Sequence, residues 1–147
     1  MTVAEDLVTG FENLINTANI TPRPVVVDNI PEPTAQARGR PWICVGNIGN
    51  IAEWSTLSTN TNIWKFDWDL QVMLGSGVTT NIKQSRTTVH SIWEQILVAL
   101  ANNNTLGVSI VTASFPTNVE MEGYGIDGNR ETRLTGNINI KTYGLGG

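Results

Sequence analysis

The sequence contains only one cysteine, Cys44, and one histidine, His90, among 147 residues. A single cysteine excludes a disulfide within the chain, and the two residues together cannot supply the cluster of His and Cys ligands that structural zinc needs. Apolar runs are short, as at residues 96–100, and fall far below the roughly 18 residues that span a bilayer. We therefore expect neither a zinc site nor a membrane-spanning helix.

Charge is also scarce, because Asp, Glu, Lys and Arg make up 15% of the chain against about 25% in typical domains. Nine Lys+Arg against 13 Asp+Glu give a net charge of -4, which argues against sequence-specific binding of nucleic acid. The N-terminus carries Glu5 and Asp6 where a signal peptide needs cations, so secretion is not expected. In place of charge the chain has 16 Asn and 18 Thr. Such a surface leaves few ionic barriers to self-association.

The first half of the chain predicts a helix, an extended arm and a strand. Apolar residues at spacings of three and four predict a helix over residues 3–18. Residues 20–41 hold five of the six prolines and predict a proline-rich extended arm, with an edge strand at the valines 25–27. A short strand is expected at 42–45. The Gly/Asn/Ser/Thr-rich segment 46–62 is interpreted as a long loop, a length at which loops are usually functional or disordered.

The second half predicts a strand, a helix and a hairpin. In residues 64–74 the apolar residues Trp64, Phe66, Trp68, Leu70, Val72 and Leu74 alternate with Lys65, Asp67, Asp69 and Gln71, as in a strand with one wet face. Ser85 is the expected N-cap of an amphipathic helix that ends at the asparagines 102–104. A strand opening at Leu106 is then followed by a hairpin around the turn at 127–128. That turn predicts Met121 opposite Leu134, Glu122 opposite Arg133 and Phe115 opposite Ile140, with a bulge at Pro116.

These elements predict an α+β fold, with a mainly antiparallel sheet and two amphipathic helices packed on one face. The length favours a single domain over residues 1–147, ending in a flexible tail at 144–147.

Two pairs of carboxylates on strand faces are candidates for chemistry: Asp67 with Asp69, and Glu120 with Glu122. Paired carboxylates can serve general acid/base catalysis, but charged solvent faces have the same pattern. No nucleophile motif or phosphate-binding loop accompanies them, so we expect no enzymatic activity, no cofactor and no metal. Cys44 is interpreted as a core residue and His90 as an exposed or capping residue.

Candidate contact residues lie in the long loop and the arm. Trp54, with Ile51 and Leu57, would anchor to a neighbouring surface, either of this chain or of a partner. Arg23, Arg38 and Arg40 concentrate positive charge on the arm. That arm either docks on an acidic neighbour or is simply solvated.

The order of elements resembles that of the tail terminator, or tail completion, proteins of long-tailed bacteriophages. The resemblance is carried by the strand start at 40–45, the strand at 64–72, the helix around Trp93 and the closing strand at 136–140. It implies a homo-oligomeric, hexameric ring that ends the tail tube and joins it to the neck. The implied partners are other copies of the chain, the tail tube protein and a neck or connector protein. The resemblance is also compatible with a contact to a tail sheath.

The resemblance also implies a location in the virion tail near the neck, after assembly in the host cytoplasm. If the acidic pairs Asp67/Asp69 and Glu120/Glu122 face the ring channel, they would repel DNA phosphates. Two alternatives remain open from the sequence: another neck or connector protein of a phage, and a monomeric module that binds a ligand through tryptophan.

Overall fold

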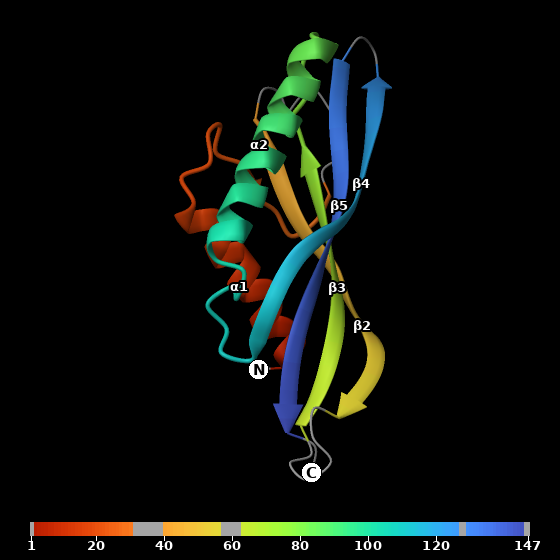
Figure 1. The fold of residues 1–147 in the computed structure, drawn as a ribbon. Coiled ribbons are helices and arrows are strands. Elements are labelled where there is room, and N and C mark those ends of the chain that lie inside the picture. The colour runs from red at the N-terminus through yellow and green to blue at the C-terminus, as the bar shows by residue number, and fades with distance from the viewer. Residues whose placement is uncertain (1, 31–39, 57–62, 127–128, 146–147) are drawn as a thin grey trace.

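A computed structural model describes residues 2–30, 40–56, 63–126 and 129–145 of the chain. The elements follow in the order α1 (Val3–Thr17), β1 (Val25–Val26), β2 (Trp42–Thr56), β3 (Ile63–Gly75), α2 (Ile82–Asn102), β4 (Val111–Ile126) and β5 (Asn129–Leu145). The strands form one sheet in the order β1-β2-β3-β5-β4 (Figure 1). β1 is parallel to β2, and all other neighbours are antiparallel. The α+β prediction is confirmed.

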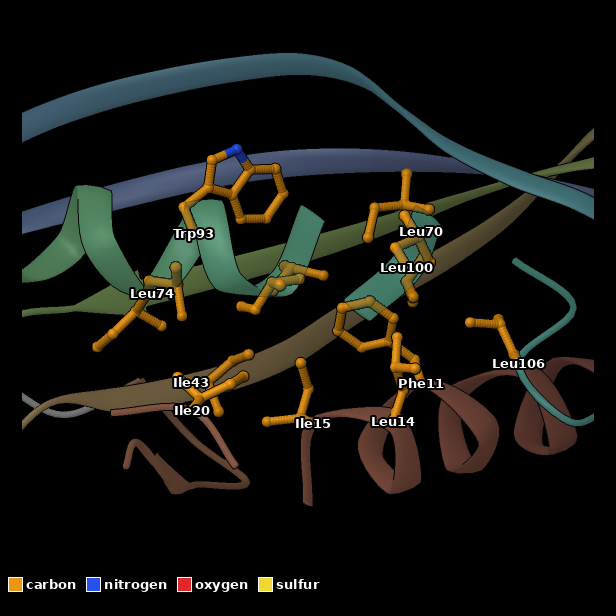
Figure 2. Packing of buried hydrophobic residues seen from close by; sticks show 14 of the residues in the cluster. Phe11, Leu14, Ile15, Ile20, Ile43, Leu70, Leu74, Trp93, Leu100 and Leu106 are labelled. Carbon is orange, nitrogen blue, oxygen red and sulfur yellow. The ribbon is translucent and has the colours of Figure 1, made fainter. Parts of the chain in front are cut away.

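Both helices pack on one face of the sheet and enclose the core. In Figure 2, Phe11 and Leu14 of α1 point toward Leu100 of α2 and toward the sheet. The apolar residues of β3 that alternate in the sequence, Leu70, Val72 and Leu74, are fully buried beneath the helices. Period-two patterning therefore identified the buried face correctly.

The long loop predicted over 46–62 is wrong for residues 46–56, which continue β2. The remaining residues of that loop, and residues 31–39 of the arm, lie outside the described part of the chain. β2 pairs along β3 with register shifts between Val45 and Ile48 and between Ile51 and Ser55. The long partner strand offers backbone groups throughout, so pairing overrides the poor strand propensity of Gly and Asn, and the irregularities accommodate the extra residues.

Two predicted strand boundaries are also corrected. The expected flexible tail at 144–147 is wrong for Gly144 and Leu145, because both belong to β5 and pair with the start of β3. The strand predicted to open at Leu106 begins instead at Val111. Leu106 has a φ of 56° and lies in a turn, yet its side chain is buried against the core. Leu106 is therefore apolar because it is buried in a turn, and together with Val108 and Ile110 it produced an alternation that wrongly predicted a strand.

The helix α2 begins one turn earlier than predicted. Its N-cap is Asn81, whose Oδ1 accepts a hydrogen bond from the backbone of Gln84 at 3.1 Å. Ser85, the predicted cap, is buried instead, and its hydroxyl lies 2.7 Å from that of Thr132 on β5. The predicted end of the helix is confirmed at the C-cap Asn103.

The predicted hairpin register is confirmed for most of β4 and β5. Met121 lies opposite Leu134 and Glu122 opposite Arg133. A register shift between Pro116 and Asn118 confirms the predicted bulge, which follows from the missing N–H of proline. Beyond the shift the partners move by one residue, so Phe115 lies opposite Asn139 rather than the predicted Ile140.

Trp68 lies at the margin of the core and carries a testable stability contribution. Its side chain is half-buried against the core, and its indole Nε1 donates to the hydroxyl of buried Thr142 at 2.9 Å. We expect Trp68→Ala to lower the free energy of unfolding by about 3 kcal/mol, as measured by urea denaturation. Trp68→Phe keeps the aromatic bulk and should lose about 1 kcal/mol. A loss below about 1 kcal/mol for alanine would show that the ring stabilises nothing.

Candidate assembly surface

The face of the sheet opposite the helices, here called the outer face, is polar. Side chains alternate across each strand and paired residues share a face, so the residues next to the buried ones point outward. The outer-face positions include Asp67, Asp69, Gln71 and Met73 on β3, Thr135, Asn137, Asn139 and Lys141 on β5, and Asn118, Glu120 and Glu122 on β4. The sheet therefore has one apolar face, under the helices, and one polar face, as the alternation in residues 64–74 predicts.

The structure brings both predicted acidic pairs onto this outer face. Asp67 and Asp69 lie on β3 and Glu120 and Glu122 on β4, with β5 between the two strands. Each pair was visible in the sequence as two carboxylates on one strand. Their common face follows only from the strand order, which places β5 next to both.

The two aspartates have partners on β5. Lys141 Nζ lies 3.0 Å from Asp67 Oδ1, in a partly exposed ion pair, and the amide of Asn137 donates to Asp69 Oδ2 at 3.0 Å. An exposed ion pair of this kind contributes about 0.2 to 1 kcal/mol. These carboxylates are therefore held in position by the sheet, which fits a structural surface better than a pair of catalytic groups.

One end of the outer face exposes aromatic side chains. Phe115 is 41% and Tyr143 is 40% exposed. Lys141 lies over the Phe115 ring, with its Nζ 5.8 Å from the centroid. Exposed aromatic rings beside charged groups are typical of protein contacts rather than of solvated surface.

The other end of the outer face contains a buried polar cluster that the sequence did not reveal. The indole Nε1 of Trp42 donates to Glu131 Oε2 at 3.1 Å, and Arg133 Nε lies 2.6 Å from Glu131 Oε1. The Arg133 guanidinium also covers the Trp42 ring, at 5.2 Å from its centroid. Glu131 is 2% exposed. Gly75 lies under the indole, where any Cβ would collide with the ring.

A groove separates the first turns of α2 from the strands β4 and β5. Its volume is about 670 Å³, and its lining includes Ile82, Arg86, His90, Met121 and Arg130. The sequence analysis missed this groove because its residues are scattered from 82 to 132. Only the hairpin register and the direction of α2 bring them together.

The predicted contact residues of the loop and arm are dispersed. The backbones of Ile51 and Trp54 lie in β2, and Ile51 pairs with Asp67. Arg23 donates to the carbonyl of Asn16, at the end of α1, at 3.3 Å. The backbone of Arg40 packs against Gly77, where a Cβ would lie 2.6 Å from the Arg40 backbone and where φ is 76°, so both the space and the backbone conformation favour glycine. Leu57 and Arg38 lie outside the described residues.

Cys44 and His90 occupy unrelated environments. Cys44 is buried on β2, and burial raises the pKa of its thiol, with the Asp28 and Glu12 carboxylates raising it further. Its neutral thiol fits the predicted role as a core residue. His90 is exposed on α2 and lines the groove.

Searches of the described residues for other kinds of site gave negative results. Across residues 2–30, 40–56, 63–126 and 129–145, no group of three or more His, Cys, Asp and Glu could hold a metal ion. Neither helix in these ranges is long and apolar enough to cross a membrane.

Comparison with known proteins finds a similar fold but no sequence relative. No protein family model matches the sequence, and no curated protein matches it. Among solved structures, a chain in the virion of a native gene transfer agent (GTA) particle is similar, with a TM-score of 0.54 and 10% sequence identity. The similarity covers 91% of this chain and 84% of that chain. The fold described here is therefore also the fold of a chain found in a virion.

Proposed function

We propose that this protein is a structural virion component of a phage-like particle. More specifically, it forms a homo-oligomeric ring, hexameric by its resemblance to tail terminators, that caps the tail tube and joins it to the neck. The observation that carries the proposal is the fold shared with a virion chain over 91% of the sequence. The resemblance of the sequence to tail terminators points independently in the same direction. This role requires contact surfaces rather than an active site.

The sheet supplies the features that a ring subunit needs. Within the described part of the chain, β4 is an edge strand of 16 residues that pairs only with β5, and an unpaired edge of that length is a template for contact with another chain. A head-to-tail interface that closes into a ring leaves no such edge available for further growth. Ring closure would therefore explain how a chain with a long open edge ends a tube instead of extending it.

The outer face is suited to the channel of the ring. Its positions on the described strands include five carboxylates, at Asp67, Asp69, Glu120, Glu122 and Glu131, against three cations, at Lys65, Arg133 and Lys141. A surface with excess negative charge repels DNA phosphates and so keeps a passage from binding the DNA that moves through it. We infer that this face lines the channel, while the helices form the outside of the ring.

The proposal predicts that the protein limits the length of tail tubes. Adding it to polymerising tube subunits should shorten the tubes in proportion to its concentration, because a capped end adds no further subunits. Electron microscopy of the tubes measures their length distribution. Trp54→Ala should weaken the effect if this part of β2 contacts the tube, and Val98→Ala, at a 61% exposed position on α2, should not.

Two outcomes would favour the alternatives. Rings that leave tube length unchanged at saturating concentration would indicate a neck or connector protein instead. A strictly monomeric protein without effect on the tubes would contradict the assembly role and favour a ligand-binding module.

A further inference from the structure

At one end of the sheet, a single row of paired residues runs from the edge strand β1 to the edge strand β4. Following the register, Val25 of β1 pairs with Trp42, which pairs with Gly75, then Arg133, then Glu122 of β4. β1 and the groove beside β4 thus lie at opposite ends of the same row of residues. Because β1 runs parallel to β2, residues 28–30 lie beyond this row, in the direction of the row that contains Val45 and Val119. A second copy placed edge to edge, and shifted along the strands by the distance from Val25 to Asp28, would bring its residues 28–30 to the groove.

The groove on the β4 side is cationic, although the chain as a whole is acidic. The cations Arg86 and Arg130 line it together with His90; Lys83 lies one turn away on α2, and Glu94 lies further along the same helix surface. The three cations are exposed, and within the described ranges none of them forms an ion pair. Of the carboxylates in the lining, Glu131 is engaged by Trp42 and Arg133, and Glu122 lies opposite Arg133 in the sheet.

The start of α2 adds to this excess of positive charge. Its first turn contains no acidic residue, so Lys83 lies at the positive end of the helix dipole without compensation. The start of α1 shows the opposite arrangement, with Glu5 and Asp6 in its first turn and a complete capping box. An anionic group in the groove would relieve the unfavourable charge that the isolated chain has there.

The opposite edge offers a carboxylate and an apolar side chain just after β1, on an arm that also carries the cations Arg23 and Arg40. Asp28 follows β1 and is exposed, and Ile30, two residues later, is 47% exposed. The groove likewise has an apolar part beside its cations, formed by Ile82, which is 48% exposed, and Met121.

We propose that residues 28–30 of one copy occupy the groove of the next copy around the ring. Asp28 would meet Arg86 and Arg130, and Ile30 would cover Ile82 and Met121. The contact joins two different surfaces, so it is head-to-tail, as ring closure requires. This inference rests on the proposed ring and names the surfaces that hold it together.

Charge reversal tests the contact. Asp28→Lys and Arg86→Glu should each weaken self-association at least about tenfold, because each places like charges together in a partly desolvated contact. An equimolar mixture of the two variants should recover assembly. In alternating copies, the introduced lysine of the first variant meets the introduced glutamate of the second, and the retained Asp28 of the second meets the retained Arg86 of the first. Sedimentation velocity over a concentration series measures each case, and circular dichroism checks that the variants fold.

A matched control is Asp69→Lys, which makes the same charge change as Asp28→Lys on the central strand β3, away from both edges of the sheet, and should leave self-association unchanged. If the wild type forms rings but the two reversals match this control, or their mixture fails to recover, the groove contact is wrong and the ring stands. If the wild type itself remains monomeric at all concentrations, the proposed ring fails and this contact fails with it.

Discussion

Glu131→Ala is expected to lower the free energy of unfolding by about 3 to 5 kcal/mol, as when one partner of a buried ion pair is removed. The carboxylate is 2% exposed and holds two neighbours, the indole of Trp42 and the guanidinium of Arg133. Without it the indole N–H loses its acceptor inside the fold, and Arg133 loses its closest counter-charge. Urea denaturation followed by tryptophan fluorescence measures the loss.

The matched control for this experiment is Glu120→Ala. Glu120 is exposed on the same outer face, and its removal should change stability by no more than about 0.5 kcal/mol. If both alanine variants lost similar amounts, the cluster around Glu131 would contribute nothing beyond ordinary surface charge.

Trp93→Ala is also expected to lower the free energy of unfolding by about 3 to 5 kcal/mol. Its side chain is 6% exposed in the core between α2 and the sheet (Figure 2). The ring lies directly over Gly136 of β5, where a Cβ would overlap with it. Glycine at this position therefore allows the helix to approach the sheet closely, and the indole fills the space that the missing side chain leaves.

A double-mutant cycle isolates this contact from general burial. Gly136→Ala alone should cost about 1 to 3 kcal/mol by overpacking, but in the Trp93→Ala background its cost should nearly vanish because the colliding ring is gone. Val98→Ala on the exposed side of α2 serves as the control and should change stability by less than about 0.5 kcal/mol. Equal costs of Gly136→Ala in both backgrounds would contradict direct packing of the ring on Gly136.

The parts of the fold that could be predicted from the sequence are those governed by local periodicity. The alternation through Leu70, Val72 and Leu74 identified the buried face of β3, and the turn predicted at 127–128 gave the correct hairpin register as far as the bulge at Pro116. Residues 46–56 could not be assigned to β2 in the same way. Their Gly and Asn residues favour turns locally, and only the neighbouring strand β3 holds them in the sheet.

The candidate surfaces were less predictable because they depend on strand order. The sequence showed the acidic pairs on β3 and β4, but their common face required β5 to lie between those strands. In the sequence, Glu131 has the pattern of an ordinary polar residue of the last strand, because its partner, the indole of Trp42, is 89 residues away. The cationic groove was likewise invisible, because Arg86 and Arg130 meet only through the packing of α2 beside the hairpin.

Negative-stain electron microscopy of the purified protein at high concentration tests the central claim most directly. The account predicts closed rings of uniform size, with the outer face of each sheet toward the central channel. Assembly should weaken as the salt concentration rises, because the proposed groove contact is partly ionic. Particles that remain single subunits at every concentration, or that grow into open filaments without closing, would contradict it.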